Sequence, residues 1–106
     1  MLLRMQNLKV IVLYTAPTDV EEFEKHYSEV HAGLVGALPG IEGVETGRIA
    51  RALDRGTELY YRIAVLSFAD KTAMQNAFGS PEGKALGEDF ARIAPEGTRQ
   101  FLVEMD

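Results

Sequence analysis

Residues 58–68, with the sequence ELYYRIAVLSF, carry the strongest strand pattern in the chain. Apolar side chains occupy both alternating sets of positions, since Ile63 and Val65 alternate with Ala64, Leu66 and Phe68. A run rich in β-branched and aromatic residues predicts a strand. An antiparallel strand with one face in water would instead alternate apolar and polar residues. We therefore expect this strand to be covered on both of its faces.

A second segment, LKVIVLY at residues 8–14, repeats this two-sided pattern. The other elements are predicted from capping residues, from Pro and Gly turns and from apolar periodicity. They are a helix over 19–29 with a short second helical turn over 31–38, a strand over 43–52, a turn at 54–57, helices over 70–78 and 80–93, and a strand over 99–105. The short turn predicts that the strands on either side of it form a hairpin. The order βαββαβ predicts an α+β, ferredoxin-like domain with a four-stranded antiparallel sheet and its helices on one face.

The helices of such a domain cover only one face of the sheet, which leaves the other apolar face open. A second copy of the chain is the simplest cover, and we expect a homodimer in which two sheets meet face to face as a dimeric α/β barrel. The alternative is a curled sheet with a modest exposed patch.

The composition of the chain disfavours or excludes several classes of partner and of chemistry. The chain has 106 residues, which fits one domain over 1–106, and its net charge of −5 disfavours nucleic acid and anionic membranes as partners. It has no cysteine, so disulfides and thiolate chemistry are excluded. The segment 1–7 is too short and polar for a secretory signal, and no apolar run is long enough to span a bilayer. We expect a cytoplasmic protein.

His31 is the strongest candidate for chemistry. Val20, Phe23, Tyr27 and His31 recur at helical spacing, so the imidazole shares a face with core aromatic residues. The functional interpretation makes His31 a general acid or base, with Tyr27 one turn earlier as a hydrogen-bond partner. The structural interpretation is a core histidine bonded to a backbone carbonyl, beside a tyrosine whose hydroxyl lies at the rim of the core.

Aromatic side chains are expected to line a pocket beside His31 for a small hydrophobic or aromatic molecule. Those predicted to contact it are Tyr14, Phe23, Tyr61, Phe78 and Phe90. The sequence alone does not decide which of the neighbours Tyr60 and Tyr61 faces this pocket, because adjacent strand residues point to opposite faces.

The remaining polar candidates are weaker. His26 lies five residues from His31, so on a helix the two do not share a face, and we expect a solvated histidine and no metal site. Arg48 and Arg62 lie in strands and are expected to pair with Glu across the hairpin rather than to clamp an anion. Asp89 is interpreted either as a partner for a basic group or as a surface residue. Nucleotide-binding and serine-hydrolase motifs are absent.

The chain resembles the EthD family of the dimeric α/β barrel superfamily. The residues that carry the resemblance are Tyr14 and Pro17-Thr18-Asp19, then Phe23, Tyr27 and His31 at four-residue spacing, then Leu38-Pro39-Gly40, and later Ser80-Pro81-Glu82-Gly83 and Asp89-Phe90. They cover most of the chain. The family often has a proline after the histidine, where this chain has Ala32-Gly33.

The resemblance implies a ferredoxin-like subunit in a barrel-forming dimer. Similar small barrels act without a cofactor as monooxygenases, cyclases, dehydratases or isomerases on aromatic or polyketide substrates, and the fold does not choose among them. We expect such an enzyme, with no cofactor and with His31 as acid or base. The alternatives are a non-catalytic ligand-binding or accessory protein of a degradation pathway, and a haem-binding relative.

Overall fold

The computed structural model describes residues 8–57 and 59–106. In chain order the elements are β1 (Leu8–Tyr14), α1 (Val20–His26), the π-helical turn η1 (Tyr27–His31), α2 (Ala32–Gly36), β2 (Gly43–Arg48), β3 (Arg62–Phe68), α3 (Lys71–Gly79), α4 (Pro81–Ile93) and β4 (Arg99–Glu104). The expectations for residues 1–7 and for Glu58 lie outside the described residues.

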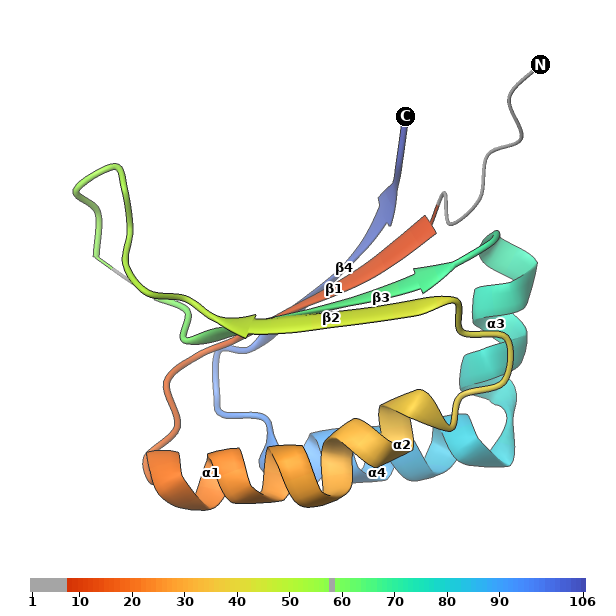
Figure 1. Ribbon diagram of the computed structural model, residues 1–106, viewed down its shortest axis with the longest axis horizontal. Coiled ribbons are helices and arrows are strands. Elements are labelled where there is room, and N and C mark those ends of the chain that lie inside the picture. Colours follow the sequence, from red (N-terminus) through yellow and green to blue (C-terminus); the bar gives the residue numbers. More distant parts are fainter. Residues whose placement is uncertain (1–7, 58) are drawn as a thin grey trace.

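The four strands form one antiparallel sheet in the order β2-β3-β1-β4, which is the ferredoxin-like topology predicted from the sequence. The helices lie on one side of this sheet, and no described helix or strand covers the opposite side, which we call the open face (Figure 1). Within the described ranges, no helix has the length and apolar character that a membrane crossing requires.

The helices begin where the sequence places their caps. The side chains of Asp19, Asp70 and Ser80 accept hydrogen bonds from the backbone N–H groups of Glu22, Ala73 and Gly83. Each bond satisfies a backbone donor that the first helical turn leaves free. These caps fix where α1, α3 and α4 start relative to the sheet.

The two faces of the central strands differ in burial, and the open face carries the hydrogen-bonded pair Lys9 and Ser67 beside its apolar residues. On β1 the helix-facing Val10 and Val12 are buried, whereas Ile11 and Leu13 on the open face are only half-buried. The strand β3 repeats the pattern, and its half-buried Val65 pairs directly with Ile11. The middle of the open face is therefore an apolar surface without a cover from the described part of this chain, and Lys9, Ser67 and Glu45 lie beside it on the same face.

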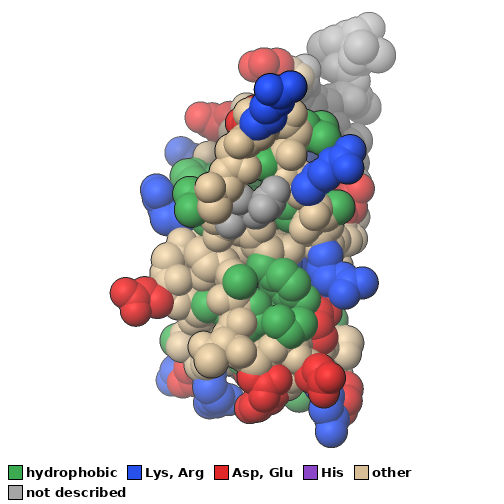
Figure 2. All heavy atoms as spheres, turned by 90° about the vertical axis from the view of Figure 1, so that its left-hand side faces the viewer, with side chains coloured by type: hydrophobic (Ala, Val, Ile, Leu, Met, Phe, Trp, Pro, Cys, Tyr) green, Lys and Arg blue, Asp and Glu red, His purple; other side chains and the backbone are tan. Residues whose placement is uncertain are grey.

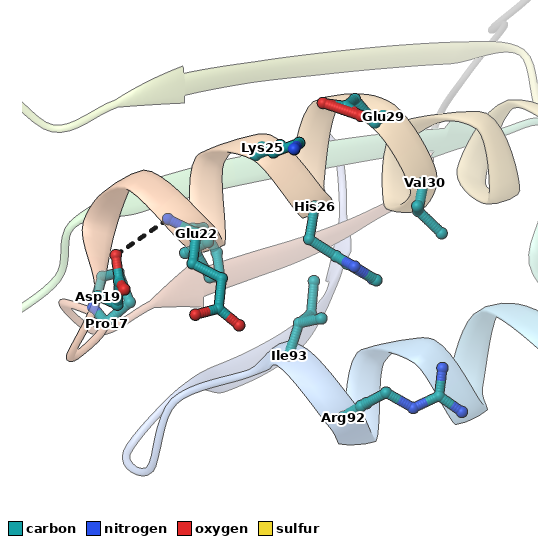
Figure 3. Close-up of a pocket in the computed structure, with 10 residues that line it drawn as sticks. Pro17, Asp19, Glu22, Lys25, His26, Glu29, Val30, Arg92 and Ile93 are labelled. Atoms are coloured by element: carbon teal, nitrogen blue, oxygen red, sulfur yellow. Dashed lines mark hydrogen bonds between the residues drawn. The ribbon is translucent and has the colours of Figure 1, made fainter.

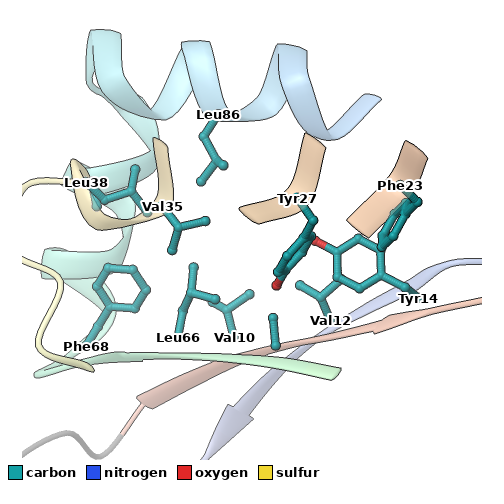
Figure 4. Packing of buried hydrophobic residues seen from close by; sticks show 12 residues of the cluster. Val10, Val12, Tyr14, Phe23, Tyr27, Val35, Leu38, Leu66, Phe68 and Leu86 are labelled. Atoms are coloured by element: carbon teal, nitrogen blue, oxygen red, sulfur yellow. The ribbon is translucent and has the colours of Figure 1, made fainter. Parts of the chain in front are cut away.

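The core lies between the sheet and the helices (Figure 4). Phe68 and aliphatic side chains fill the part near α2, and a cluster of aromatic side chains fills the part near α1. Tyr14 forms edge or tilted contacts with Phe23, Tyr27 and Phe90 at centroid distances of 5.7 to 5.8 Å. This cluster encloses the site described below.

The connection between β2 and β3 differs from the tight hairpin predicted from the sequence. The strands pair as expected, but β2 ends at Arg48, β3 begins at Arg62, and the described residues between them, 49–57 and 59–61, form a loop. Asp54 accepts a hydrogen bond from the N–H of Gly56, so the predicted turn does form. It lies within a longer loop and does not join the two strands directly. Beneath this loop, hydrophobic side chains gather at the end of the molecule where α1 begins (Figure 2).

Gly83 and Gly87, both in α4, give opposite predictions for substitution by alanine. A Cβ atom at Gly83 would lie 2.4 Å from the backbone oxygens of Ala77 and Phe78, whereas nothing lies within 4 Å of one at Gly87. We expect Gly83→Ala to lower the free energy of unfolding by about 2 kcal/mol, because the backbone of α3 must move. The control Gly87→Ala is expected to raise it by up to about 1 kcal/mol. Urea denaturation measures both, and equal effects would contradict the close packing of α3 on α4.

Candidate functional site

His31 is buried at the centre of the aromatic cluster, with 2% of its surface exposed. Its Nδ1 lies 2.8 Å from Oδ2 of Asp89, and its Nε2 lies 3.3 Å from the hydroxyl oxygen of Tyr14. The rings of Tyr27 and Phe90 pack on the imidazole at centroid distances of 5.5 and 6.3 Å. Both nitrogens thus have side-chain partners, in place of the backbone carbonyl of the structural interpretation.

Asp89 fixes which nitrogen of His31 carries hydrogen. Burial of this carboxyl, which is 3% exposed, acts to raise its pKa, but hydrogen bonds from His31 and His26 hold the pKa below its usual value. The carboxylate is therefore ionised and can only accept hydrogen bonds. Nδ1 of His31 must then donate, so in the neutral ring the lone pair is on Nε2, which faces the hydroxyl of Tyr14.

His26 binds the other oxygen of the same carboxylate, with Nε2 2.7 Å from Oδ1 of Asp89. The reason is the π-helical turn η1, in which the N–H of Ala32 bonds to the carbonyl of Tyr27 five residues earlier. In an α-helix, residues five apart are rotated by about 140°. The wider π turn, a feature often found at functional sites, brings residues five apart close to the same side.

The sequence expectation for His26 is therefore wrong, because its side chain is only 30% exposed and is bonded to a buried acid. Of the two interpretations left open for Asp89, the partner of a basic group is confirmed. Its carboxylate pairs with two imidazoles and weakly with Arg92 at 3.6 Å. The error on His26 came from assuming an unbroken α-helix.

The two core tyrosines beside His31 are held as neutral phenols. Burial is the main cause that raises the pKa of Tyr14, assisted by the neighbouring Tyr27. Burial also raises the pKa of Tyr27, against the opposing charge of Arg62. Tyr14 rather than Tyr27 is the hydrogen-bond partner of His31, because Tyr27 presents its ring to the imidazole.

A second polar network contacts the aromatic cluster from the sheet. Arg62 forms two hydrogen bonds to Glu24, at 2.6 and 3.2 Å, and its guanidinium lies 4.5 Å from the centroid of the Tyr27 ring. Glu24 also accepts a bond of 2.5 Å from the hydroxyl of Tyr61. Arg62 thus pairs with a glutamate as predicted, but the partner is on α1 and not across the hairpin.

The structure does not bring all the predicted pocket residues to one cavity. Tyr14, Phe23 and Phe90 pack around His31 and fill the space beside it. Tyr61 contacts Phe23 edge-on and lines a separate cavity with Arg48. Phe78 packs on Phe68 near the other end of the core. Their roles toward a ligand stay predictions.

A second opening lies next to this cluster, between α1 and the end of α4 (Figure 3). It has a volume of about 510 Å³, and both His26 and Phe23 line it. In the described ranges, no group of three or more His, Asp and Glu side chains is arranged to hold a metal ion.

Asp89→Asn tests the shared carboxylate. We expect the free energy of unfolding to fall by about 2 kcal/mol at pH 7, because two charge-assisted hydrogen bonds are weakened. Since folding lowers the pKa of Asp89, its contribution is present above the unfolded value of about 4 and is lost as the pH falls through the folded value. The difference between wild type and variant should therefore shrink in acid.

The exposed neighbour Glu88 provides the control, because Glu88→Gln removes a charge from the same turn of α4. We expect this control to change stability by less than about 0.5 kcal/mol. Urea denaturation from pH 7 to pH 3 measures both variants. Equal stability losses for the two, or a difference that grows in acid, would contradict the role given to Asp89.

Known proteins are similar to most of this chain. The family model described as EthD domain matches residues 16–96. A Rhodococcus erythropolis protein, described as an uncharacterized 11.0 kDa protein in the thcB-thcC intergenic region, is 31% identical over 91% of this chain and 92% of its own length. The crystal structure of an EthD family protein from Bacillus halodurans is 29% identical, with a TM-score of 0.87, over 93% of this chain and 98% of that one.

More distant structures share the fold alone. A dimeric ferredoxin-like protein of unknown function from Jannaschia is 19% identical, with a TM-score of 0.69, and covers 92% of this chain and 98% of its own. SnoaB, a cofactor-independent oxygenase from Streptomyces nogalater, is 16% identical, with a TM-score of 0.64, over 91% of this chain and 89% of that one. The fold therefore occurs in dimers and in an enzyme that needs no cofactor.

Proposed function

The chain belongs to the EthD domain family, and on this basis we propose that it is a homodimer that binds a small hydrophobic or aromatic molecule and transfers a proton through His31 without a cofactor. The observation that carries the proposal is the buried line of side chains from Asp89 through His31 to Tyr14, with distances of 2.8 and 3.3 Å.

The homodimer is supported by the open face of the sheet. Half-buried apolar side chains from β1 and β3 lie there with nothing from the described chain over them, and Phe101 of β4 extends the surface with 38% exposure. A twofold dimer would bury this face against its own copy. A structural neighbour with the same sheet is itself described as dimeric.

Acid–base chemistry is supported by the arrangement of the three buried groups. An ionised carboxylate that orients an imidazole, whose second nitrogen faces a hydroxyl, is the geometry by which enzymes prepare a base. The contact from Nε2 to Tyr14 is the longest in the line, at 3.3 Å, and is the one that a ligand would replace. His31 would then take the ligand's proton at Nε2, Asp89 would stabilise the imidazolium, and the neutral phenol of Tyr14 would donate to a ligand oxygen.

A specific observation favours a second candidate, a non-catalytic ligand-binding or accessory protein. The aromatic rings of Tyr14, Tyr27 and Phe90 fill the space around His31, which is 2% exposed. A histidine satisfied in this way stabilises a core without touching a ligand. The two candidates agree on binding and differ on whether His31 exchanges a proton with the bound molecule.

Deuterium transfer from solvent separates the two. The protein is incubated in D₂O with a panel of small aromatic ketones and phenols, and incorporation of deuterium at carbon is followed by mass spectrometry. The proposed function predicts that the wild type accelerates exchange in at least one compound that it also binds by calorimetry. Binding of panel members without accelerated exchange of any of them would favour the ligand-binding alternative.

A further inference from the structure

The opening between α1 and α4 has the size and walls of a ligand site. Its volume of about 510 Å³ lies within the range of small-molecule pockets. Phe23, Val30 and Ile93 supply apolar surface, and Figure 3 shows Val30 and Ile93 on either side of the imidazole of His26. An apolar molecule of one ring would be partly desolvated between these walls.

His26 presents a prepared base to this cavity. Its Nε2 donates to the buried, ionised Asp89 at 2.7 Å, so in the neutral ring the lone pair is on Nδ1. Nδ1 has no hydrogen bond to any residue in the ranges 8–57 and 59–106, and the side chain is 30% exposed. An imidazole held by a carboxylate, with its other nitrogen free at a cavity, meets the geometric requirement for a general base.

The charged groups around His26 have both signs. Asp89 and Arg92 face it from α4, Lys25 and Glu29 lie beside it on its own helical segment, and Glu22 lies one turn earlier. Asp19 lines the entrance to the cavity. Lys25 and Arg92 can therefore face an anion formed in the cavity.

We propose that this cavity binds a weakly acidic organic molecule with an apolar body, and that Nδ1 of His26 accepts the acidic hydrogen from its oxygen. The O–H bond of the ligand breaks and its electron pair stays on the oxygen, while the proton forms the new N–H bond of His26. The products are an anion facing Lys25 and Arg92 and an imidazolium beside Asp89. The inference goes beyond the proposed function, because it requires no proton transfer by His31.

The probe 4-nitrophenol tests the inference, because only its phenolate absorbs strongly in the visible. At a pH one unit below the pKa of the free probe, we expect added wild-type protein to raise the phenolate band to saturation. A stabilisation of the bound anion by about one pKa unit corresponds to a ~10-fold higher ratio of phenolate to phenol for the bound probe. Calorimetry measures the binding separately from the proton transfer.

Four variants test which residues cause the rise of the phenolate band. His26→Gln should abolish the rise, and Val30→Trp should abolish binding by filling the cavity while leaving His26 in place. Lys84→Gln, an exposed change on α4 outside the cavity, should leave both unchanged. His31→Gln should also leave the rise intact, which separates this inference from the proposed function. No saturable rise with wild type, or a rise that survives His26→Gln and disappears with His31→Gln, would overturn the inference.

Discussion

Replacing His31 by glutamine is expected to lower the rate of proton exchange on a bound ligand by ~10² to 10⁴-fold, the usual contribution of a positioned acid or base. Glutamine cannot carry a proton at neutral pH, but its amide N–H₂ can still donate to Asp89. The variant should therefore remain folded and should still bind. Initial rates of deuterium incorporation at saturating ligand measure the loss, and circular dichroism on heating reports the fold.

Tyr14→Phe completes this test, because it removes only the hydroxyl that Nε2 of His31 faces at 3.3 Å and keeps the ring in the core. We expect a smaller fall in rate than for His31→Gln, since the base remains. The exposed substitution Lys84→Gln serves as the matched control and should not change the rate. Exchange that stays within a factor of two of wild type in His31→Gln, with the ligand bound, would rule out His31 as the proton acceptor.

A carboxylate on the open face of the sheet is expected to convert a dimer into monomers. Val65 lies at the middle of β3, opposite Ile11 of β1, on the face that the helices do not cover. In a twofold dimer, Val65→Glu places two charges in one apolar interface. At about 2 kcal/mol or more for each, the dissociation constant rises by roughly 10³-fold.

Sedimentation velocity at micromolar concentration measures this effect. Wild type should sediment as a dimer and Val65→Glu as a monomer. Thr46→Glu is the control on the opposite face, because Thr46 pairs with the helix-facing Ala64 and is exposed. A wild-type protein that sediments as a monomer, or a Val65→Glu variant that stays dimeric, would contradict the proposed assembly.

The architecture could be predicted because the strand patterns and the helix-capping residues indicated the same order of strands and helices. The two-sided apolar pattern of residues 8–14 and 58–68 indicated strands that are covered on both faces, and Asp70 and Ser80 marked helix starts that the structure reproduces. The loop over 49–61 was missed because a genuine Asp–Gly turn signal does not reveal how far the flanking strands extend. Leu53 and Leu59 did not indicate the loop either, because both are apolar residues, and only the structure shows that their side chains are exposed.

Only part of the candidate site could be predicted from the sequence. His31 stands out by its place on an apolar helical face. Asp89 carried a usable signal, because it falls within the apolar stripe of Leu86, Phe90 and Ile93, where a charged residue indicates a buried partner. The position of His26 had no such signal, since it depends on a π turn that local residue preferences do not predict.

Imidazole nitrogen spectroscopy of the wild-type protein tests the central claim most directly, because the chain contains only two histidines. In long-range ¹H–¹⁵N spectra at neutral pH, the account predicts His31 with hydrogen on Nδ1 and a bare Nε2, and a downfield N–H signal that Asp89→Asn abolishes. Hydrogen on Nε2 of His31, or a ring whose two nitrogens average as in a free imidazole, would contradict the buried carboxylate–imidazole–phenol line.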